Sequence, residues 1–481
     1  MAFEEARWLH FERRGGETIR AALERSLREA MASGALRQGV QLPSSRALAA
    51  QLGISRGVTS EAYEQLAAQG LLINRVKASP VVAGVARSPH PAPSRQVVRP
   101  ARIDLMPTTP DVSLFPARRW AAALLDTVRA APVAAYDYGD PCGERELREA
   151  LADHLGWTRG VVADPERIVV VSGTAQGIDV VARLLAGRDA RRVAVEDPSL
   201  DTQPQRIRLS GLEAVGQPVD GDGIVVDGLD ADAVLVTPAH QFPTGAVLSG
   251  VRRRALLGWA RGRDALVVED DYDAEFRYDR EPVRALQGLD PDRVVYAGTV
   301  SKTLAPALRL GWLVLPHGLA EEAARIKHLL DVSSAVIDQR ALARFLTGGE
   351  YNRHVRRMRV VYRRRRDALL AAVAERLPDL AVRGVAAGIH VLLPLPSGCD
   401  DRAVAAEAER DGVRVTPLSR YGISRPAGPG LVLGYGRVNE AAIDEAVRTL
   451  ARAIERASRG AGMTSAAPRQ PERISSAYPA R

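Results

Sequence analysis

The sequence predicts a chain of two folded domains, a winged helix-turn-helix domain and a larger α/β domain. Its 481 residues are too many for one ordinary hydrophobic core. Helical periodicity dominates residues 1–84, whereas short apolar runs alternate with helical stretches over residues 103–458. Residues 85–102, with four prolines and four arginines, are predicted to be an extended linker. The small, polar residues 459–481 are predicted to be a disordered tail.

The composition is that of a cytoplasmic globular protein, at 46% hydrophobic and 26% charged residues. No apolar run approaches the roughly 20 residues that span a bilayer, and the charged first residues do not form a secretory signal. Two cysteines, Cys142 and Cys399, cannot build a disulfide framework. The eight histidines lack ligand-like spacing, so we expect no metal site.

Positive charge is concentrated at the N-terminus. Residues 1–102 hold 15 of the arginines and lysines against 8 acidic residues, whereas the whole chain has a net charge of +8. A basic domain on a nearly neutral body favours a polyanionic partner, although drift in an arginine-rich proteome is the alternative. Only three residues of the chain are lysines, namely Lys77, Lys302 and Lys327.

The N-terminal domain is predicted from three consecutive helices and a hairpin. Residues 18–31 carry an apolar stripe, and the segment LPSSRALAAQLG opens a second helix after a Pro-Ser-Ser cap. Gly53 ends that helix, and Ser55 caps a third one, SRGVTSEAYEQLAAQ. The next residues, LLINRVKASPVVA, are expected to form a two-stranded wing.

The third helix has the character of a recognition helix, which would aim Arg56 and Ser60 at base edges in the major groove. Arg46 and Lys77 suit contacts to phosphate or to the flanking groove. The alternative is a helical cap domain in which Arg56 is merely solvated.

The stretch LPSSRALAAQLGISRGVTSEAYEQLAAQGLL closely resembles the DNA-binding domain of GntR-type regulators. Two departures concern the order Val58-Thr59 and a wing tip, residues 77–80, that lacks the usual glycines. With double-stranded operator DNA as the implied partner, the candidate DNA-binding residues are Ser44, Arg46, Ser55, Arg56, Ser60 and Lys77.

The large domain is predicted to contain a largely parallel sheet. The runs RIVVV, RVAV, AVLV, ALVV, RVVYAG and LGWLVL suit strands buried on both faces. Helical stretches such as residues 175–186 and 250–260 separate several of these runs and produce a βαβ rhythm. A smaller α+β portion is expected from about residue 380.

Three motifs of this domain are suited to one phosphorylated cofactor. In VSGTAQGIDVVARLL, a turn that opens a helix could bind phosphate through backbone amides. The strand in ALVVEDDYDAEF would deliver a carboxylate to the ligand edge of the sheet, unless this is a solvated acidic turn. In AGTVSKTLAPALRLGW, Lys302 could form a Schiff base if it is desolvated, whereas the alternative is a surface lysine.

Together these motifs resemble fold-type I aminotransferases, which bind pyridoxal 5′-phosphate, from Leu105 to Ile454. The resemblance implies that Lys302 is the aldimine lysine, that Asp270 pairs with the pyridine nitrogen and that Tyr272 lies beside the ring oxygen. It implies a homodimer, because Tyr138 matches a tyrosine lent by the neighbouring subunit. The implied phosphate-binding residues are Gly173, Thr174, Ala175, Thr299 and Arg309.

The combination of both domains resembles the MocR (GabR-like) subfamily, and the segments TPAHQFPTG and EDDYDAEFRY are close to the sequence motifs of that subfamily. Three residues depart from related sites. Phe242 replaces an asparagine that contacts the ring oxygen, and Leu200 replaces a tyrosine that stacks on the ring. Val432 stands where aminotransferases carry an arginine that clamps the substrate carboxylate, with Arg437 nearby but out of register.

Three hypotheses follow from these residues. The first is a ligand-responsive DNA-binding regulator that binds pyridoxal phosphate and responds to it or to an amine or amino acid through Lys302. The second is an active aminotransferase with an accessory DNA-binding domain, against which the missing clamp argues. The third is a regulator whose large domain has lost the cofactor, which Leu200 and Phe242 keep open.

Overall fold

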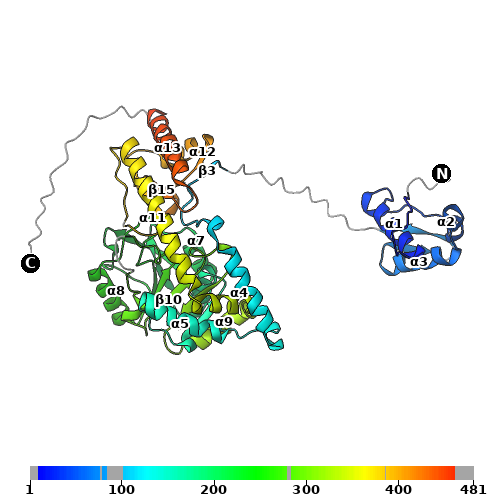
Figure 1. Ribbon diagram of the computed structural model, residues 1–481, viewed down its shortest axis with the longest axis horizontal. Helices are drawn as coiled ribbons and strands as arrows, with labels where there is room; N and C mark the ends of the chain where they lie inside the picture. The colour runs from blue at the N-terminus through cyan, green and yellow to red at the C-terminus, as the bar shows by residue number, and fades with distance from the viewer. Residues whose placement is uncertain (1–8, 76–77, 84–100, 279–282, 385, 461–481) are drawn as a thin grey trace, which may run out of the picture. The chain divides into compact units, whose positions relative to one another are not determined.

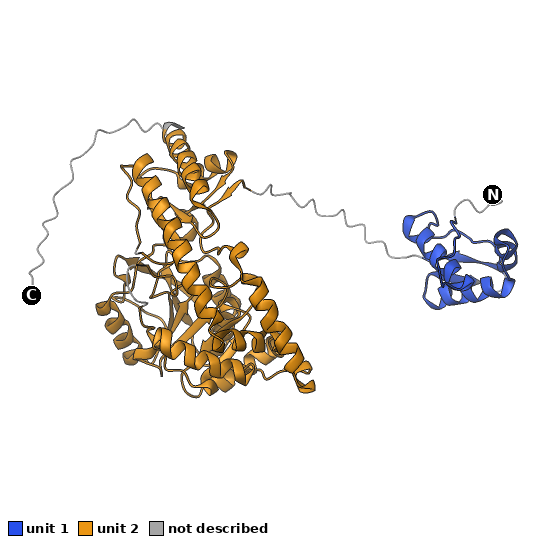
Figure 2. Ribbon diagram, viewed as in Figure 1, with its two compact units in different colours: residues 1–99 blue, residues 100–481 orange. Residues whose placement is uncertain are grey.

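The computed structural model describes residues 9–75, 78–83, 101–278, 283–384 and 386–460. The chain divides into two units, residues 1–99 and 100–481 (Figure 2). The linker predicted over residues 85–102 falls almost entirely outside the described residues, as does nearly all of the tail predicted from residue 459. Each unit is described by itself.

The first unit is a winged helix-turn-helix. Its elements are α1 Ile19–Ser33, α2 Ser45–Leu52, α3 Arg56–Ala68, β1 Leu72–Arg75 and β2 Ala78–Val82 (Figure 1). The two strands pair antiparallel and form the wing. One hydrophobic core joins the helices, because the apolar stripe of α1, with Leu23 and Leu27, packs with Leu48 of α2 and Leu66 of α3.

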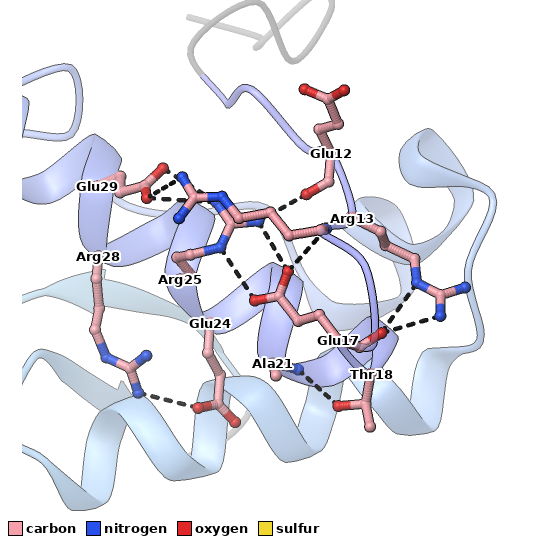
Figure 3. Close-up of polar contacts among 10 residues, drawn as sticks. Glu12, Arg13, Glu17, Thr18, Ala21, Glu24, Arg25, Arg28 and Glu29 are labelled. Carbon is pink, nitrogen blue, oxygen red and sulfur yellow. Dashed lines mark hydrogen bonds and ion pairs between the residues drawn. The ribbon is translucent and has the colours of Figure 1, made fainter.

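A polar network ties the segment before α1 to that helix (Figure 3). The hydroxyl oxygen of Thr18 caps the helix by accepting a hydrogen bond from the Ala21 amide at 3.2 Å. The guanidinium of Arg25 donates to both carboxylate oxygens of Glu17 and to the carbonyl of Glu12 at 2.7 Å. The Arg25 contact lowers the pKa of Glu17. These contacts hold residues 12–18 against the helix.

The second unit is an α/β domain. Its helices are α4 Ala117–Ala130, α5 Arg145–Arg159, α6 Thr174–Gly187, α7 Thr202–Leu209, α8 Gly250–Arg263, α9 Ala320–Asp331, α10 Val336–Thr347, α11 Glu350–Arg376, α12 Asp401–Arg410 and α13 Glu440–Gly460. Its strands are β3 Ile103–Asp104, β4 Ile168–Val171, β5 Arg192–Asp197, β6 Glu213–Asp220, β7 Gly223–Ile224, β8 Ala233–Val236, β9 Leu266–Asp271, β10 Val294–Thr299, β11 Gly311–Val314, β12 His390–Pro394, β13 Val413–Arg414, β14 Thr416–Pro417 and β15 Gly430–Gly434.

Eight strands form the main sheet, in the order β4-β11-β10-β9-β8-β5-β6-β7. The sheet is largely parallel as predicted, and β11 runs antiparallel to both of its neighbours. Both faces are covered by helices. In β4, Val169 and Val171 face a core shared with α6 and α9, whereas Ile168 and Val170 face a core shared with α5 and α10. This burial on both faces explains why the six predicted strand sequences are continuously apolar.

Two features of this unit were absent from the sequence prediction. Strand β6 has no continuous apolar run, because it lies near the sheet edge and buries only part of its length. The smaller portion comprises the sheet β12-β15-β14 and the helices α11, α12 and α13, which share one core (Figure 1). Residues far earlier than 380 also belong there, since β3 pairs parallel with β13 and Leu105 enters that core.

In the described part of the chain, no helix combines the length and the apolar character required to cross a membrane.

Candidate functional site

Hydroxyl groups begin both helices of the helix-turn-helix. The side chain of Ser44 accepts a hydrogen bond from the Ala47 amide at 3.2 Å, and that of Ser55 accepts one from the Val58 amide at 3.3 Å. Gly53, at a φ of 65°, ends α2 in the left-handed conformation that the tight turn between the helices requires. The serines thus set where each helix starts.

Two arginines at these helix starts are available to a partner. Arg46, in the first turn of α2, and Arg56, the first residue of α3, are both exposed, and neither has an ion pair among the described residues. Ser60 is half-buried one turn further along α3. Lys77 lies outside the described residues. The unusual Thr59 is fully buried, and its hydroxyl has no hydrogen bond there.

In the second unit, the turn after β4 opens helix α6. Gly173 is the N-cap residue of this helix, at a φ of 91°, and no side chain caps it. The first amides of α6, at Thr174 and Ala175, therefore lie at an open helix N-terminus of the kind that binds phosphate. The guanidinium of Arg309 donates to the Ser172 carbonyl and lies against Gly173.

Neighbouring residues support this turn. The Thr299 hydroxyl donates at 2.9 Å to the carbonyl of Leu310, the residue after Arg309. The Gln176 side chain accepts a hydrogen bond from the Ser172 amide at 2.7 Å and donates to Asp331, which is paired with the buried Lys327. Lys327 is thus a structural lysine that pairs within α9 with Asp331, the residue that joins α9 to the start of α6.

Lys302 follows β10 and lies within electrostatic reach of two carboxylates. Burial lowers the pKa of the Lys302 ammonium, whereas Asp273 and Asp270 act in the opposite direction. No hydrogen bond of the ammonium is recorded within the described ranges. A lysine with a lowered pKa has more free amine available as a nucleophile.

Asp270 lies near the end of β9, and burial raises its pKa to about 7. One carboxylate oxygen accepts a hydrogen bond from Gln203 at 3.3 Å, whereas the other is buried without a partner among the described residues. An unpaired buried oxygen is what a protonated ring nitrogen would satisfy. With the open helix N-terminus of α6, Arg309 and the primary amine of Lys302, these residues fit pyridoxal phosphate.

Tyr272 and two histidines meet beside these acids. The Tyr272 hydroxyl donates to the His240 carbonyl at 3.0 Å, and the Nδ1 atom of His240 lies 3.0 Å from a carboxylate oxygen of Asp273. The ring of His390, in β12, lies tilted against that of His240, with 4.6 Å between the ring centroids. This group could not be recognised from the sequence, because 150 residues separate the two histidines. Their ligand atoms and that of Asp273 lie within 4.8 Å of one another, so the absence of a metal site stays a prediction.

Phe242 and Val432, which stand where related sites have an asparagine and an arginine, are both buried. They belong to one apolar cluster with Tyr272 and Tyr421. Val432 is the central residue of β15 and pairs with Leu392. Leu200, which stands where a ring-stacking tyrosine was expected, is 37% exposed.

Two other residues lie away from this cluster. Arg437 pairs with Asp104 at 3.3 Å instead of reaching the clamp position. Tyr138 is 83% exposed, and its side chain has no recorded contact with the phosphate turn in the described part of the chain.

Two families match the chain. Aminotransferases of class I and II match residues 108–456, and bacterial regulatory proteins of the gntR family match residues 19–82. The solved kynurenine aminotransferase of Pyrococcus horikoshii is 28% identical, with a TM-score of 0.68 over 74% of this chain and 91% of that one. The multiple substrate aminotransferase of Thermococcus profundus is 27% identical, with a TM-score of 0.69 over 74% and 92%. The second unit therefore has the fold-type I aminotransferase fold.

Curated relatives extend through both units. The HTH-type pyridoxine biosynthesis transcriptional regulator PdxR of Corynebacterium glutamicum is 34% identical over 88% of this chain and 93% of its own length. The probable rhizopine catabolism regulatory protein MocR of Rhizobium meliloti is 31% identical over 90% of this chain and 93% of its own length. The chain therefore belongs to the MocR-like subfamily of HTH-type transcriptional regulators, in which a gntR-family domain precedes an aminotransferase-like domain.

Proposed function

We propose that this protein is a cytoplasmic, homodimeric transcription regulator that binds operator DNA with its first unit and pyridoxal phosphate with its second. The observation that carries the proposal is that Lys302 lies within electrostatic reach of buried Asp270, which keeps one carboxylate oxygen without a partner among the described residues. Pyridoxal phosphate supplies an aldehyde that condenses with a primary amine and a ring that withdraws electrons when its nitrogen is protonated. Lys302 provides the amine, and Asp270 holds the proton on the ring nitrogen.

The remaining residues orient the cofactor. The amides of Thr174 and Ala175 and the guanidinium of Arg309 bind its phosphate, together with the hydroxyl of Thr299. The Tyr272 hydroxyl would hold the ring oxygen, where Phe242 of the same cluster offers no hydrogen bond. The homodimer is supported by the exposure of Tyr138, which is free to enter a neighbouring subunit's site, and by the exposed Val133 beside it.

DNA recognition is proposed for the helix-turn-helix. Arg56 and Ser60 of α3 contact base edges, and Arg46 at the start of α2 contacts phosphate, as does Lys77 of the wing. Ser44 and Ser55 present their helix starts to the DNA backbone. Ligand binding at the second unit regulates DNA binding only if the ligand binds two arrangements of the dimer with unequal affinity.

The test is the visible absorption of the purified protein mixed with pyridoxal phosphate. Wild type is compared with Lys302→Ala and with Lys302→Arg, which keeps the cation but lacks a primary amine that condenses with the aldehyde. We expect a visible band for wild type alone, shifted from that of the free cofactor. A folded wild type without such a band would refute cofactor binding and leave a DNA-binding dimer on an empty aminotransferase scaffold.

An active aminotransferase is the second candidate, because Lys302, Asp270 and Tyr272 are all present. The buried Val432 at the clamp position argues against it, since an amino-acid carboxylate has no cation to orient it there. Multiple turnovers of amino transfer with any amino acid would favour this candidate over a sensor.

A further inference from the structure

His390 is a buried side chain that no role described above uses. It begins β12, opposite Gly434 of β15, and is 1% exposed. Its ring lies 4.6 Å from that of His240 and 5.2 Å from that of Phe242, measured between centroids. It also lies within electrostatic reach of the Lys302 ammonium. His390 thus borders the proposed cofactor site from the side of the smaller sheet.

The imidazole of His390 lacks hydrogen bonds that it could make. The Pro243 carbonyl faces the ring, but neither ring nitrogen has a hydrogen bond of good geometry to a described residue. Burial, with His240 and Lys302 nearby, holds the pKa of His390 well below its usual value of 6.5. The ring is therefore neutral at physiological pH and offers one donor and one acceptor. A buried polar group left unpaired costs free energy, which an arriving partner recovers.

The surroundings of His390 exclude a carboxylate anchor. On β12, His390 and Leu392 point to the same side of the strand, and Leu392 pairs with Val432, the residue at the clamp position. Phe242 and Tyr421 complete an apolar wall there. None of these wall residues carries a charge, so a carboxylate packed against them would lose hydration without an ion pair from the wall.

We propose that His390 recognises the second polar group of an amine ligand, and that this group is neutral, an amide or a hydroxyl rather than a carboxylate. The inference rests on the proposed function, because the amine would condense with the cofactor held at Lys302. The hydrocarbon body of such a ligand packs on Phe242 and Val432, and its neutral donor or acceptor pairs with the imidazole.

The experiment uses the full chain loaded with pyridoxal phosphate and four amines of one skeleton. These are leucinol, leucinamide, leucine and 4-methylpentan-2-amine, which differ only in the group beside the amine. The half-saturating concentration of each is read from the change in visible absorption. We expect leucinol and leucinamide to act at concentrations at least tenfold below that of the hydrocarbon amine, about 1.4 kcal/mol of binding. Leucine should be no better than the hydrocarbon amine.

Variants at His390 separate recognition from intrinsic amine reactivity. His390→Phe fills the same space without a polar atom, and His390→Gln keeps a donor and an acceptor. The half-saturating concentration of the hydrocarbon amine divided by that of leucinol should fall to about one in His390→Phe and be partly retained in His390→Gln. Cofactor uptake should be unchanged in both variants. Three results would overturn the inference. They are a lower half-saturating concentration for leucine than for the hydrocarbon amine, a concentration ratio in His390→Phe equal to that of wild type, or no response to any amine. A wild type without a cofactor band would instead refute the proposed function.

Discussion

At the residue scale, the acids of the EDDYDAE motif have different partners although they are neighbours in sequence. Asp271 accepts hydrogen bonds from Arg159 at 2.7 Å and from Tyr296, and Asp273 faces His240. Asp270 and Asp271 each keep one carboxylate oxygen without a partner among the described residues, but only Asp271 is paired with an arginine. All three side chains are buried. A solvated acidic turn, the alternative considered from sequence, is therefore wrong.

The raised pKa of Asp270 predicts a pH-dependent effect of substitution. Between its ordinary value near 3.8 and about 7, folded Asp270 keeps a proton that the unfolded chain has lost, so stability falls as pH rises. Asp270→Asn cannot ionise. In the cofactor-free protein, the Tm of this variant minus that of wild type should therefore increase from pH 5 to pH 8.

Calorimetry at the two pH values checks this expectation. Asp271→Asn is the matched control, because breaking the buried pair with Arg159 should cost about 3–5 kcal/mol at both pH values. A Tm difference for Asp270→Asn that does not change with pH would contradict the assignment.

At the element scale, the helix at the proposed phosphate site begins differently from the helices of the first unit. Helices α1, α2 and α3 are each capped by the hydroxyl of the preceding Thr18, Ser44 or Ser55. Helix α6 begins at Gly173, which has no side chain to satisfy the first amides. A capped helix start is complete in itself, whereas an uncapped one is available to an anion.

Gly173→Ala should weaken the proposed phosphate site. The alanine would have to adopt a φ of 91°, which is strained for a residue with a side chain, and its Cβ would lie 3.2 Å from the Arg309 guanidinium. We expect the Kd for pyridoxal phosphate to rise by about tenfold or more, which corresponds to about 1.4 kcal/mol. Pyridoxal, which lacks the phosphate, serves as the control ligand. An equal loss for both ligands would show that the substitution damages the ring site rather than the phosphate site.

Neighbouring substitutions at the start of α3 should separate stability from DNA binding. Ser55→Ala removes the helix cap and should lower the stability of the first unit by about 1 kcal/mol. Arg56→Ala removes an exposed side chain, so stability should stay unchanged while operator affinity falls by about 1–3 kcal/mol. Thermal melts and DNA titrations at one fixed salt concentration measure both quantities. Unchanged DNA affinity in Arg56→Ala would remove this residue from the interface.

At the scale of the whole molecule, the two units have separate hydrophobic cores. Leu23, Leu48 and Leu66 belong to the core of the first unit, in which the described residues all come from that unit. The cores of the second unit likewise draw only on residues beyond 100 among those described. Because buried apolar area is the main source of stability, each unit has its own source of stability.

Heating the full chain should therefore give two transitions, and pyridoxal phosphate should shift only one. A ligand at 100 times its Kd stabilises the state that binds it by about 2.7 kcal/mol, so the transition of the second unit should move to higher temperature. Differential scanning calorimetry with and without the cofactor measures this. A shift of both transitions together would show that the units unfold cooperatively.

Several features of this protein followed from local sequence. The helix caps at Ser44 and Ser55, the apolar strand runs and the position of Lys302 after a strand all depend on residues close together in the chain. Local chemistry determines such features, because propensity, capping and burial on two faces act over a few residues. The order of the two domains and the largely parallel sheet were predictable for this reason.

The tertiary structure alone decided what surrounds the cofactor residues. His240 and Asp273 come from loops at the edge of the main sheet, and His390 comes from a strand more than 100 residues later. Phe242 and Val432 meet in one apolar cluster, and Arg437 is drawn away by Asp104. No sequence periodicity carries such information, because only the packing of the smaller sheet against the main one brings these side chains within a few ångströms.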